Sequence, residues 1–203
     1  MNARLSMTPG LETRRLRLRW FVETDLPVLV NLAGRREIAD TMISVPYPYT
    51  EVYAREWLAS ARLAEDRGEA FHLAVCERGG DRLVGAIELR AIDREHRQAE
   101  LSFWIGVEYW GLGYATEAAG RVIRYGFVQL EVNRIYAHHM LRNPASGVVL
   151  AKLGMRREGI LRQRVRKWGV YEDVALWAIL RDDAAHRRDP TSPPPGFQVP
   201  DYP

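Results

Sequence analysis

Cysteine is almost absent from this chain of 203 residues, in which Cys76 is the single example. One cysteine excludes an intramolecular disulfide and a zinc cluster built on thiolates. Long apolar runs are missing as well. None approaches the roughly 20 residues of a membrane-spanning helix, and residues 1–11 hold no apolar stretch typical of a signal peptide. We therefore expect an intracellular, cytoplasmic protein with no membrane partner and no bound metal.

The chain also lacks a surplus of charge of either sign. Its 29 basic and 26 acidic residues give a formal net charge of +3, and the arginines are spread along the sequence without a lysine-rich tail. Dispersed charges of this kind argue against a nucleic-acid partner. A basic cleft for a polyanionic cofactor fits this balance, and so does a mildly basic protein without an anionic ligand.

The pattern of apolar residues predicts the main helices and strands. Alternation and turn signals such as Gly79-Gly80-Asp81 predict strands at residues 16–20, 71–77, 83–89, 99–107, 134–141 and 174–180. Helical periodicity and capping residues predict helices that begin near Thr24 and cover residues 50–67, 116–130 and 146–153. Residues 156–173 should add a strand and a loop.

This order of elements indicates an α+β protein with a mixed sheet, since strands and helices do not alternate regularly. The length suits a single domain with a sizeable core, which we place at residues 1–181. Residues 182–203 are rich in proline and cannot bury enough apolar surface to order themselves, so we expect a disordered tail there.

Residues 109–118, with the sequence YWGLGYATEA, join an expected strand to an expected helix. Gly111 and Gly113 would let the backbone approach a ligand closely, and the amide groups that open the helix would attract negative charge. Together these features predict a cradle for a pyrophosphate. A turn without a ligand is the simpler alternative. A dinucleotide site of the G-x-G-x-x-G kind is disfavoured, because Thr116 occupies the third glycine position and the preceding strands form an antiparallel series.

The same segment resembles the cofactor loop of the GNAT superfamily of N-acetyltransferases. That loop reads Q/R-x-x-G-x-G/A, and residues 110–115 match it from the second position onward, with Trp110 in place of the usual Gln or Arg. Residues 109–118 look most like the subgroup that acetylates the N-termini of ribosomal proteins, the RimJ and RimL group. Residues 143–155 resemble the family's second cofactor motif and residues 171–180 its closing strand, so the similarity extends over about residues 11–180.

This resemblance implies the GNAT fold, with a mixed central sheet of about six to seven strands and helices on both faces. It implies an enzyme that transfers an acetyl group from acetyl-CoA to a primary amine by direct attack, most simply the α-amino group of a protein N-terminus. A small amine such as a polyamine or an aminoglycoside is an alternative acceptor, with carboxylates supplied by Glu51, Glu56, Glu65 and Asp66. A regulator that binds acyl-CoA without turnover is another alternative, and association into a homodimer is open.

The resemblance also implies which groups bind acetyl-CoA. The end of the strand at 99–107 would pair with the pantetheine arm as an added strand does, and the glycine loop would hold the pyrophosphate. Asn143 offers a donor and an acceptor to the pantetheine amides, although it equally suits a turn before Pro144. The expected cofactor-binding residues are Trp104, Ile105, Val107, Trp110, Gly111, Leu112, Gly113, Tyr114, Ala115, Thr116, Asn143 and Ser146.

Acetyl transfer to an amine requires a base for the ammonium proton and a means of stabilising the departing thiolate. Glu100 is the expected base, because residues 98–101 resemble the strand that carries the family's catalytic glutamate. Its alternative role is that of an exposed strand residue or a salt-bridge partner of an arginine. Glu88, one strand earlier, is the second candidate.

Ser146 is the expected acid, since a serine at this position is thought to protonate the thiolate in the RimL-like group. Many superfamily members use a tyrosine where this chain has Leu150. Ser146 would also cap the helix at 146–153, and we expect substantial activity to remain without it. His138 and His139 are neighbours in one expected strand, so one should face the core, and we expect structural roles for them more than catalytic ones.

Overall fold

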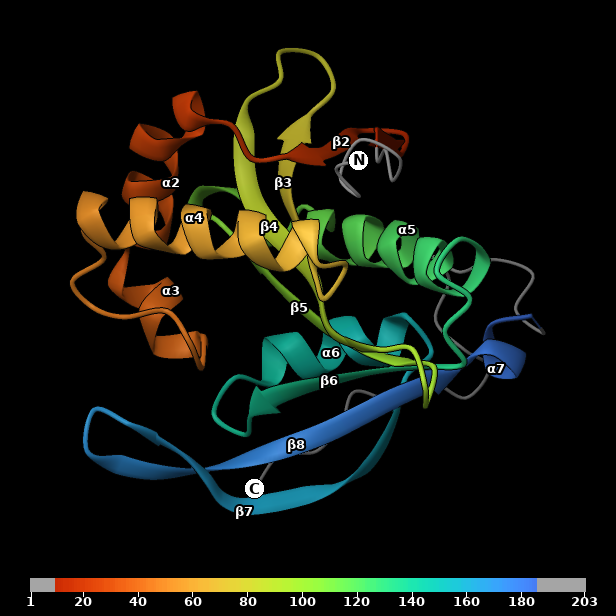
Figure 1. The fold of residues 1–203 in the computed structure, drawn as a ribbon. Helices are drawn as coiled ribbons and strands as arrows, with labels where there is room; N and C mark the ends of the chain where they lie inside the picture. The colour runs from red at the N-terminus through yellow and green to blue at the C-terminus, as the bar shows by residue number, and fades with distance from the viewer. Residues whose placement is uncertain (1–9, 186–203) are drawn as a thin grey trace.

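The computed structural model describes residues 10–185, which form one eight-stranded mixed sheet covered by helices (Figure 1). The strands are β1 (Leu11–Glu12), β2 (Leu16–Trp20), β3 (Phe71–Glu77), β4 (Leu83–Asp93), β5 (Gln98–Ile105), β6 (Arg134–Met140), β7 (Arg156–Lys167) and β8 (Val170–Leu180). The α-helices are α2 (Leu26–Ala33), α3 (Arg36–Thr41), α4 (Glu51–Asp66), α5 (Tyr114–Val128), α6 (Pro144–Lys152) and α7 (Arg181–Ala185), and the short 3₁₀ helices are η1 (Glu23–Asp25) and η2 (Val107–Tyr109). The predicted α+β fold is confirmed, with more strands than the six to seven expected.

The sheet separates two hydrophobic cores. Helices α5 and α6 cover one face, and α2, α3 and α4 pack on the other. Strand β3 supplies both cores by simple alternation: Leu73 and Val75 belong to the α5 side, and Ala74 and Cys76 to the α2–α4 side. A strand buried on both faces reads as a nearly continuous apolar run, which is how residues 71–76 appear in the sequence apart from His72.

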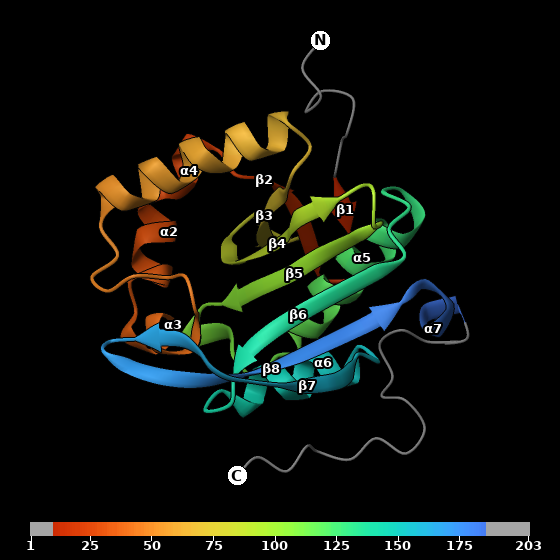
Figure 2. The same cartoon turned by 60° about the horizontal axis from the view of Figure 1, so that its bottom comes forward.

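The strands follow the order β1-β2-β3-β4-β5-β6-β8-β7. Neighbours are antiparallel except β5 and β6, which run parallel and pair only from Gln98↔Arg134 to Glu100↔Tyr136. Beyond this point β5 continues to Ile105 and β6 to Met140 with no ladder between them, so the sheet opens in its middle (Figure 2). The opening leaves one edge of β5 free to pair with another extended chain.

The cap predicted at Thr24 is wrong. Residues 23–25 form η1, and α2 begins at Leu26 with Asp25 in the N-cap position and Pro27 in its first turn. Asp25 takes over the local hydrogen bonding, because its carboxylate accepts from the amide of Val22 at 2.9 Å and pairs with the guanidinium of Arg19 at 2.7 Å. A buried ion pair between strand and helix therefore fixes this turn.

The cap predicted at Ser146 is also wrong. Helix α6 begins at Pro144, and the side chain of Asn143 accepts the amide of Ser146 at 3.3 Å. Proline suits the first helical position, and asparagine is a good N-cap, so the Asn-Pro pair sets the start of the helix. The helix predicted at residues 50–67 is confirmed as α4, and Thr50 is its N-cap, since the hydroxyl of Thr50 accepts a hydrogen bond from the amide of Tyr53 at 3.2 Å.

A short helix begins at the predicted domain boundary, residue 181. Residues 181–185 form α7, where the carboxylate of Asp183 pairs with Arg156 at 2.9 Å. The rest of the predicted tail, residues 186–203, lies outside the described residues.

Within the described ranges, no helix combines the length and the apolar character needed to cross a membrane, and the cytoplasmic location stays a prediction.

Candidate active site

An open cleft of about 470 Å³ lies where β5 and β6 separate. This volume falls within the range typical of ligand sites. The walls come from the end of β5, the glycine loop, the start of α5, the start of α6 and the end of α3. The lining residues are Ile38, Thr41, Met42, Phe103, Trp104, Ile105, Tyr109, Trp110, Gly111, Gly113, Tyr114, Ala115, Thr116, Arg142, Asn143, Pro144, Ala145, Ser146, Val149 and Lys152.

The glycine loop has the geometry of an anion cradle. Gly111 and Gly113 adopt φ angles of 75° and 78°, in the left-handed region that favours glycine. Helix α5 begins at Tyr114, two residues before the predicted start, and Gly113 is its N-cap. The first amide N–H groups of the helix have no acceptor within the helix, and they form the positive end of the helix dipole. These features fit the pyrophosphate of a CoA molecule.

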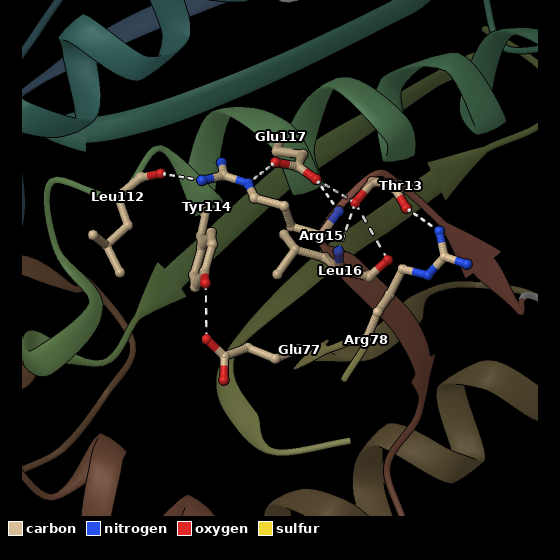
Figure 3. Close-up of polar contacts among 8 residues, drawn as sticks. All are labelled: Thr13, Arg15, Leu16, Glu77, Arg78, Leu112, Tyr114 and Glu117. Atoms are coloured by element: carbon tan, nitrogen blue, oxygen red, sulfur yellow. Dashed lines mark hydrogen bonds and ion pairs between the residues drawn. The ribbon is translucent and has the colours of Figure 1, made fainter. Parts of the chain in front are cut away.

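A polar network anchors this loop and the start of α5 to the turn between β1 and β2 (Figure 3). The guanidinium of Arg15 donates to the carboxylate of Glu117 at 2.6 Å and to the carbonyl of Leu112 at 2.9 Å. The hydroxyl of Thr13 donates to the same carboxylate at 2.5 Å. Burial would raise the pKa of Glu117, but the hydrogen bonds from Thr13 and Arg15 outweigh it and lower that pKa. The network holds the loop in place before any ligand binds.

Trp110 joins the glycine loop to the end of β5. Its indole N–H donates to the carbonyl of Ile105 at 2.6 Å, while about half of the side chain remains exposed. The carbonyl of Ile105 is one of the backbone groups expected to pair with pantetheine. Where the family usually has Gln or Arg, this chain therefore uses an indole to fix the strand end and to form part of the cleft wall.

The start of α6 forms the opposite wall. The side-chain nitrogen of Asn143, Nδ2, donates to Oγ of Ser146 at 2.9 Å and to the carbonyl of Thr41 at 3.4 Å. Because Oγ of Ser146 accepts this bond, its own hydroxyl hydrogen is available to another acceptor. The side chain of Asn143 is thus committed to organising the wall of the cleft.

A second, smaller cavity of about 40 Å³ adjoins the cleft. Thr41, Met42, Phe103 and Ser146 line both. A space of this size holds roughly three water-sized groups. The remaining lining residues are Ile43, Ser44, Arg90, Glu100, Leu101, Ser102, Ala137, His138, His139 and Leu150. The arrangement suits a large ligand in the cleft that meets a small polar group in the cavity at Ser146.

A charged cluster forms one side of the small cavity. The guanidinium of Arg90 donates two hydrogen bonds to Glu100, at 3.0 and 3.2 Å, and lies 3.6 Å from the carboxylate of Glu88. Nδ1 of His138 lies 3.2 Å from Oε1 of Glu100. Burial would raise the pKa of Glu100, but the hydrogen bonds from His138 and Arg90 lower it to about 2. The carboxylate is therefore a firmly held anion and a weak proton acceptor.

The segment between α3 and α4, residues 42–50, covers the small cavity from the other side. Nζ of Lys167 donates to the carbonyls of Met42 and Val45 at 2.9 and 2.6 Å. At the end of α3, Arg142 pairs with Asp40 at 2.6 Å. Burial lowers the pKa of Lys167. The C-terminal half of the chain thus holds this covering segment in place.

The predicted cofactor residues gather at one place in the structure. All of them line the large cleft except Val107, which begins η2, and Leu112, whose carbonyl binds Arg15. Glu100 lies in the small cavity, and Ser146 lies where the two spaces meet. Their catalytic roles stay predictions. Within residues 10–185, no group of three or more His, Cys, Asp or Glu side chains is arranged to hold a metal ion.

The sequence interpretation missed several parts of the site. It gave Arg90 no role, although opposite charges on paired strands are a readable signal, and Arg90 faces Glu100 across the β4–β5 ladder. The contact between Glu100 and His138 depends on the parallel pairing of β5 with β6 and has no local signal. The six-residue helix α3 is too short for a periodic pattern to reveal.

Comparison with known proteins identifies the class to which this fold and cleft belong. Residues 15–156 match the family described as acetyltransferase (GNAT) domain, so the chain belongs to the GNAT family. It is an acetyl-CoA-dependent N-acetyltransferase. The uncharacterized N-acetyltransferase p20 of Bacillus licheniformis is 31% identical over 176 residues, which cover 86% of this chain and 98% of the relative.

Two further relatives have named acceptors. The ribosomal protein uS5-alanine N-acetyltransferase of Escherichia coli (strain K12) is 27% identical over 135 residues, which cover 64% of this chain and 70% of the relative. The crystal structure of spermidine N-acetyltransferase from Vibrio cholerae in complex with CoA and spermine superposes with a TM-score of 0.76 at 26% identity. That match covers 86% of this chain and 100% of the spermidine N-acetyltransferase chain.

Proposed function

We propose that this enzyme acetylates the α-amino group of a protein N-terminus. The size and charge of the small cavity give the main support. About 40 Å³ has room for roughly three water-sized groups, enough for an amino group and the atoms next to it, and the carboxylate of Glu100 already has Arg90 and His138 as partners. A single amino terminus fits such a space, with the rest of the acceptor outside. The similarity to the Escherichia coli enzyme named for ribosomal protein uS5 points the same way.

A polyamine is the second candidate, because spermidine N(1)-acetyltransferase of Vibrio cholerae is 29% identical over 86% of this chain. A polyamine carries several ammonium groups and calls for several carboxylates. The carboxylates predicted for this role lie on α4. Glu51 pairs with Arg55 at 2.7 Å and Glu65 lies 3.4 Å from His72, and none of Glu51, Glu56, Glu65 and Asp66 lines either cavity. This placement favours the protein N-terminus.

In this proposal the open cleft holds acetyl-CoA. The loop from Gly111 to Thr116 would bind the pyrophosphate. The edge of β5 that β6 leaves unpaired, at Trp104 and Ile105, would pair with pantetheine beside the hydrogen bond that the carbonyl of Ile105 accepts from Trp110. The thioester would then reach Ser146, where the cleft meets the small cavity. Association into a homodimer stays a prediction.

The test is an acceptor panel with acetyl-CoA, followed by thiol release and by mass spectrometry of the products. The panel contains peptides with Ser, Ala or Met at the N-terminus, spermidine and an aminoglycoside. Matched peptides with a blocked N-terminus and an internal lysine serve as controls. We expect turnover on free N-termini and none on blocked peptides. Turnover on spermidine or the aminoglycoside with no turnover on any peptide would contradict the proposal.

A further inference from the structure

His138 stands where the sheet opens, two residues beyond the last parallel pair of β5 and β6 at Glu100↔Tyr136. It lines the small cavity, as Glu100 and Ser146 do. His139 also lines this cavity but differs in its surroundings: its side chain is buried, its Nδ1 lies 2.9 Å from the carbonyl of Met140, and burial lowers its pKa. The two histidines therefore have separate roles, and His138 is the one beside the charged cluster.

The contact with Glu100 orients the imidazole ring of His138. Glu100 is ionised and accepts hydrogen bonds from Arg90, so Nδ1 of His138, 3.2 Å away, must carry the hydrogen that it shares with the carboxylate. In the neutral ring the lone pair then resides on Nε2. Among the described residues, Nε2 makes no hydrogen bond or ion pair, and the ring's polar partner is Glu100 at Nδ1. A base oriented by a third group in this way is the usual arrangement around an activated nucleophile.

The groups around His138 come from each element that packs against it. Strand β4 contributes Arg90 and Glu88, and β5 contributes Glu100. On β6 the ring of Tyr136 contacts the imidazole edge-on at 5.6 Å. The position opposite on β8 is the apolar Leu176. Glu100 is the group in contact with Nδ1, while its own proton affinity is low because Arg90 and His138 both donate to it.

We propose that Nε2 of His138 accepts the proton of the acceptor ammonium, and that Glu100 acts as a positioning residue which fixes the ring. This inference rests on the proposed amine acetylation and assigns its base. The acceptor nitrogen first loses one proton to Nε2. It then bonds to the thioester carbon, and its second proton passes to the sulfur as the C–S bond breaks, giving the amide and the free thiol. His138 finally returns its proton to solvent.

The experiment compares the rates of His138→Gln, Glu100→Gln and the wild-type enzyme over about pH 6 to pH 9, where a general base suited to neutral pH changes its protonation. An acceptor peptide found in the panel above is the substrate. For His138→Gln we expect kcat to fall by roughly 100-fold or more, with a nearly unchanged KM for acetyl-CoA and loss of the rising limb of the pH profile. Glu100→Gln should have a lower kcat than the wild-type enzyme but should keep the rising limb of the pH profile. Added imidazole should restore part of the activity of His138→Ala.

The matched control is His96→Gln, because His96 is exposed and lies away from both cavities. This variant should behave as wild type. The inference is overturned if His138→Gln keeps the rising limb while Glu100→Gln loses it, since the carboxylate would then be the base.

Nitrogen NMR of the histidine rings separates failure of this inference from failure of the proposed function. If the wild-type enzyme acetylates no peptide, the proposed function fails, and the tautomer of His138 decides the inference by itself. We expect the neutral ring to carry its hydrogen on Nδ1, and to lose this preference in Glu100→Gln. A hydrogen on Nε2 in the wild-type protein would overturn the inference.

Discussion

Nζ of Lys167 lies 2.6 Å from the carbonyl oxygen of Val45, from which it is separated by 122 residues in the chain. It donates to the carbonyl of Met42 as well, so it holds the segment that covers the small cavity. Lys167→Met keeps the apolar stem and removes both bonds. We expect a loss of about 2 kcal/mol in the free energy of unfolding, measured with denaturant. The KM for the acceptor should rise more than the KM for acetyl-CoA.

Arg166→Met is the control for this prediction, because Arg166 is exposed and adjacent on the same strand. It should change neither quantity appreciably. An equal rise of both KM values in Lys167→Met would show that the segment serves the whole site and does not act on the acceptor alone.

Gly113→Ala should weaken the binding of CoA. The φ angle of Gly113 is 78°, and a side chain in the left-handed region costs roughly 1–2 kcal/mol. Either the protein becomes less stable by this amount or the loop relaxes and loses its anion cradle. We expect the Kd for CoA, measured calorimetrically, to increase by about tenfold. Gly80→Ala is the control, since a Cβ there meets nothing within 4 Å, and it should leave the Kd unchanged.

Glu100 should contribute to stability in a way that depends on pH. Its pKa is about 2 in the folded protein, below the ordinary value of 4.5, because the hydrogen bonds from His138 and Arg90 outweigh burial. A carboxyl group whose pKa is lower in the folded state stabilises the fold at pH values above its pKa in the unfolded state. That stabilisation is lost as the pH falls through the pKa of the folded state. The shift corresponds to roughly 3 kcal/mol at most. The difference in unfolding free energy between wild type and Glu100→Gln should therefore shrink between pH 4.5 and about 2.

A difference that stays constant over this pH range would contradict the assignment. Such a result would mean that the carboxylate of Glu100 is not held by Arg90 and His138 in the folded state.

Ser146→Ala should keep most of the activity. The thiol of CoA has a pKa of about 8 to 9, as an ordinary thiol has, so the sulfur can leave without a protein acid and take the second proton of the acceptor nitrogen. We expect kcat to fall by less than about tenfold, a smaller effect than general acid catalysis usually provides. A much larger fall with unchanged binding of CoA would make the hydroxyl of Ser146 the necessary acid.

Stability measurements on Asn143→Ala and Ser146→Ala test which of the two residues caps α6. Asn143→Ala should cost about 1 kcal/mol of stability, because Asn143 is the N-cap of α6. Ser146→Ala should cost clearly less. The opposite order would contradict the observed cap.

The sequence by itself determined the elements whose signals are local. Strand β3 is predicted at residues 71–77 and forms at Phe71–Glu77, because a short, mostly apolar run bounded by turn residues suits a strand that is buried on both faces of a sheet. The glycine loop was predicted as a cradle from Gly111 and Gly113, whose φ angles are indeed positive. The fold family followed from three motifs in the right order. Each of these features depends on neighbouring residues and on a short range of backbone conformations.

The tertiary structure decided what depends on residues far apart in the chain. Asp25 replaced Thr24 at the start of α2 because Arg19 pairs with it from β2. The meeting of Glu100 with His138 depends on a parallel pairing that ends after three positions and leaves the sheet open. The hydrogen bonds from Lys167 to the carbonyls of Met42 and Val45 depend on the packing of the end of β7 against the segment that follows α3. Packing brings such groups together across many residues, and no local pattern records the distance between them.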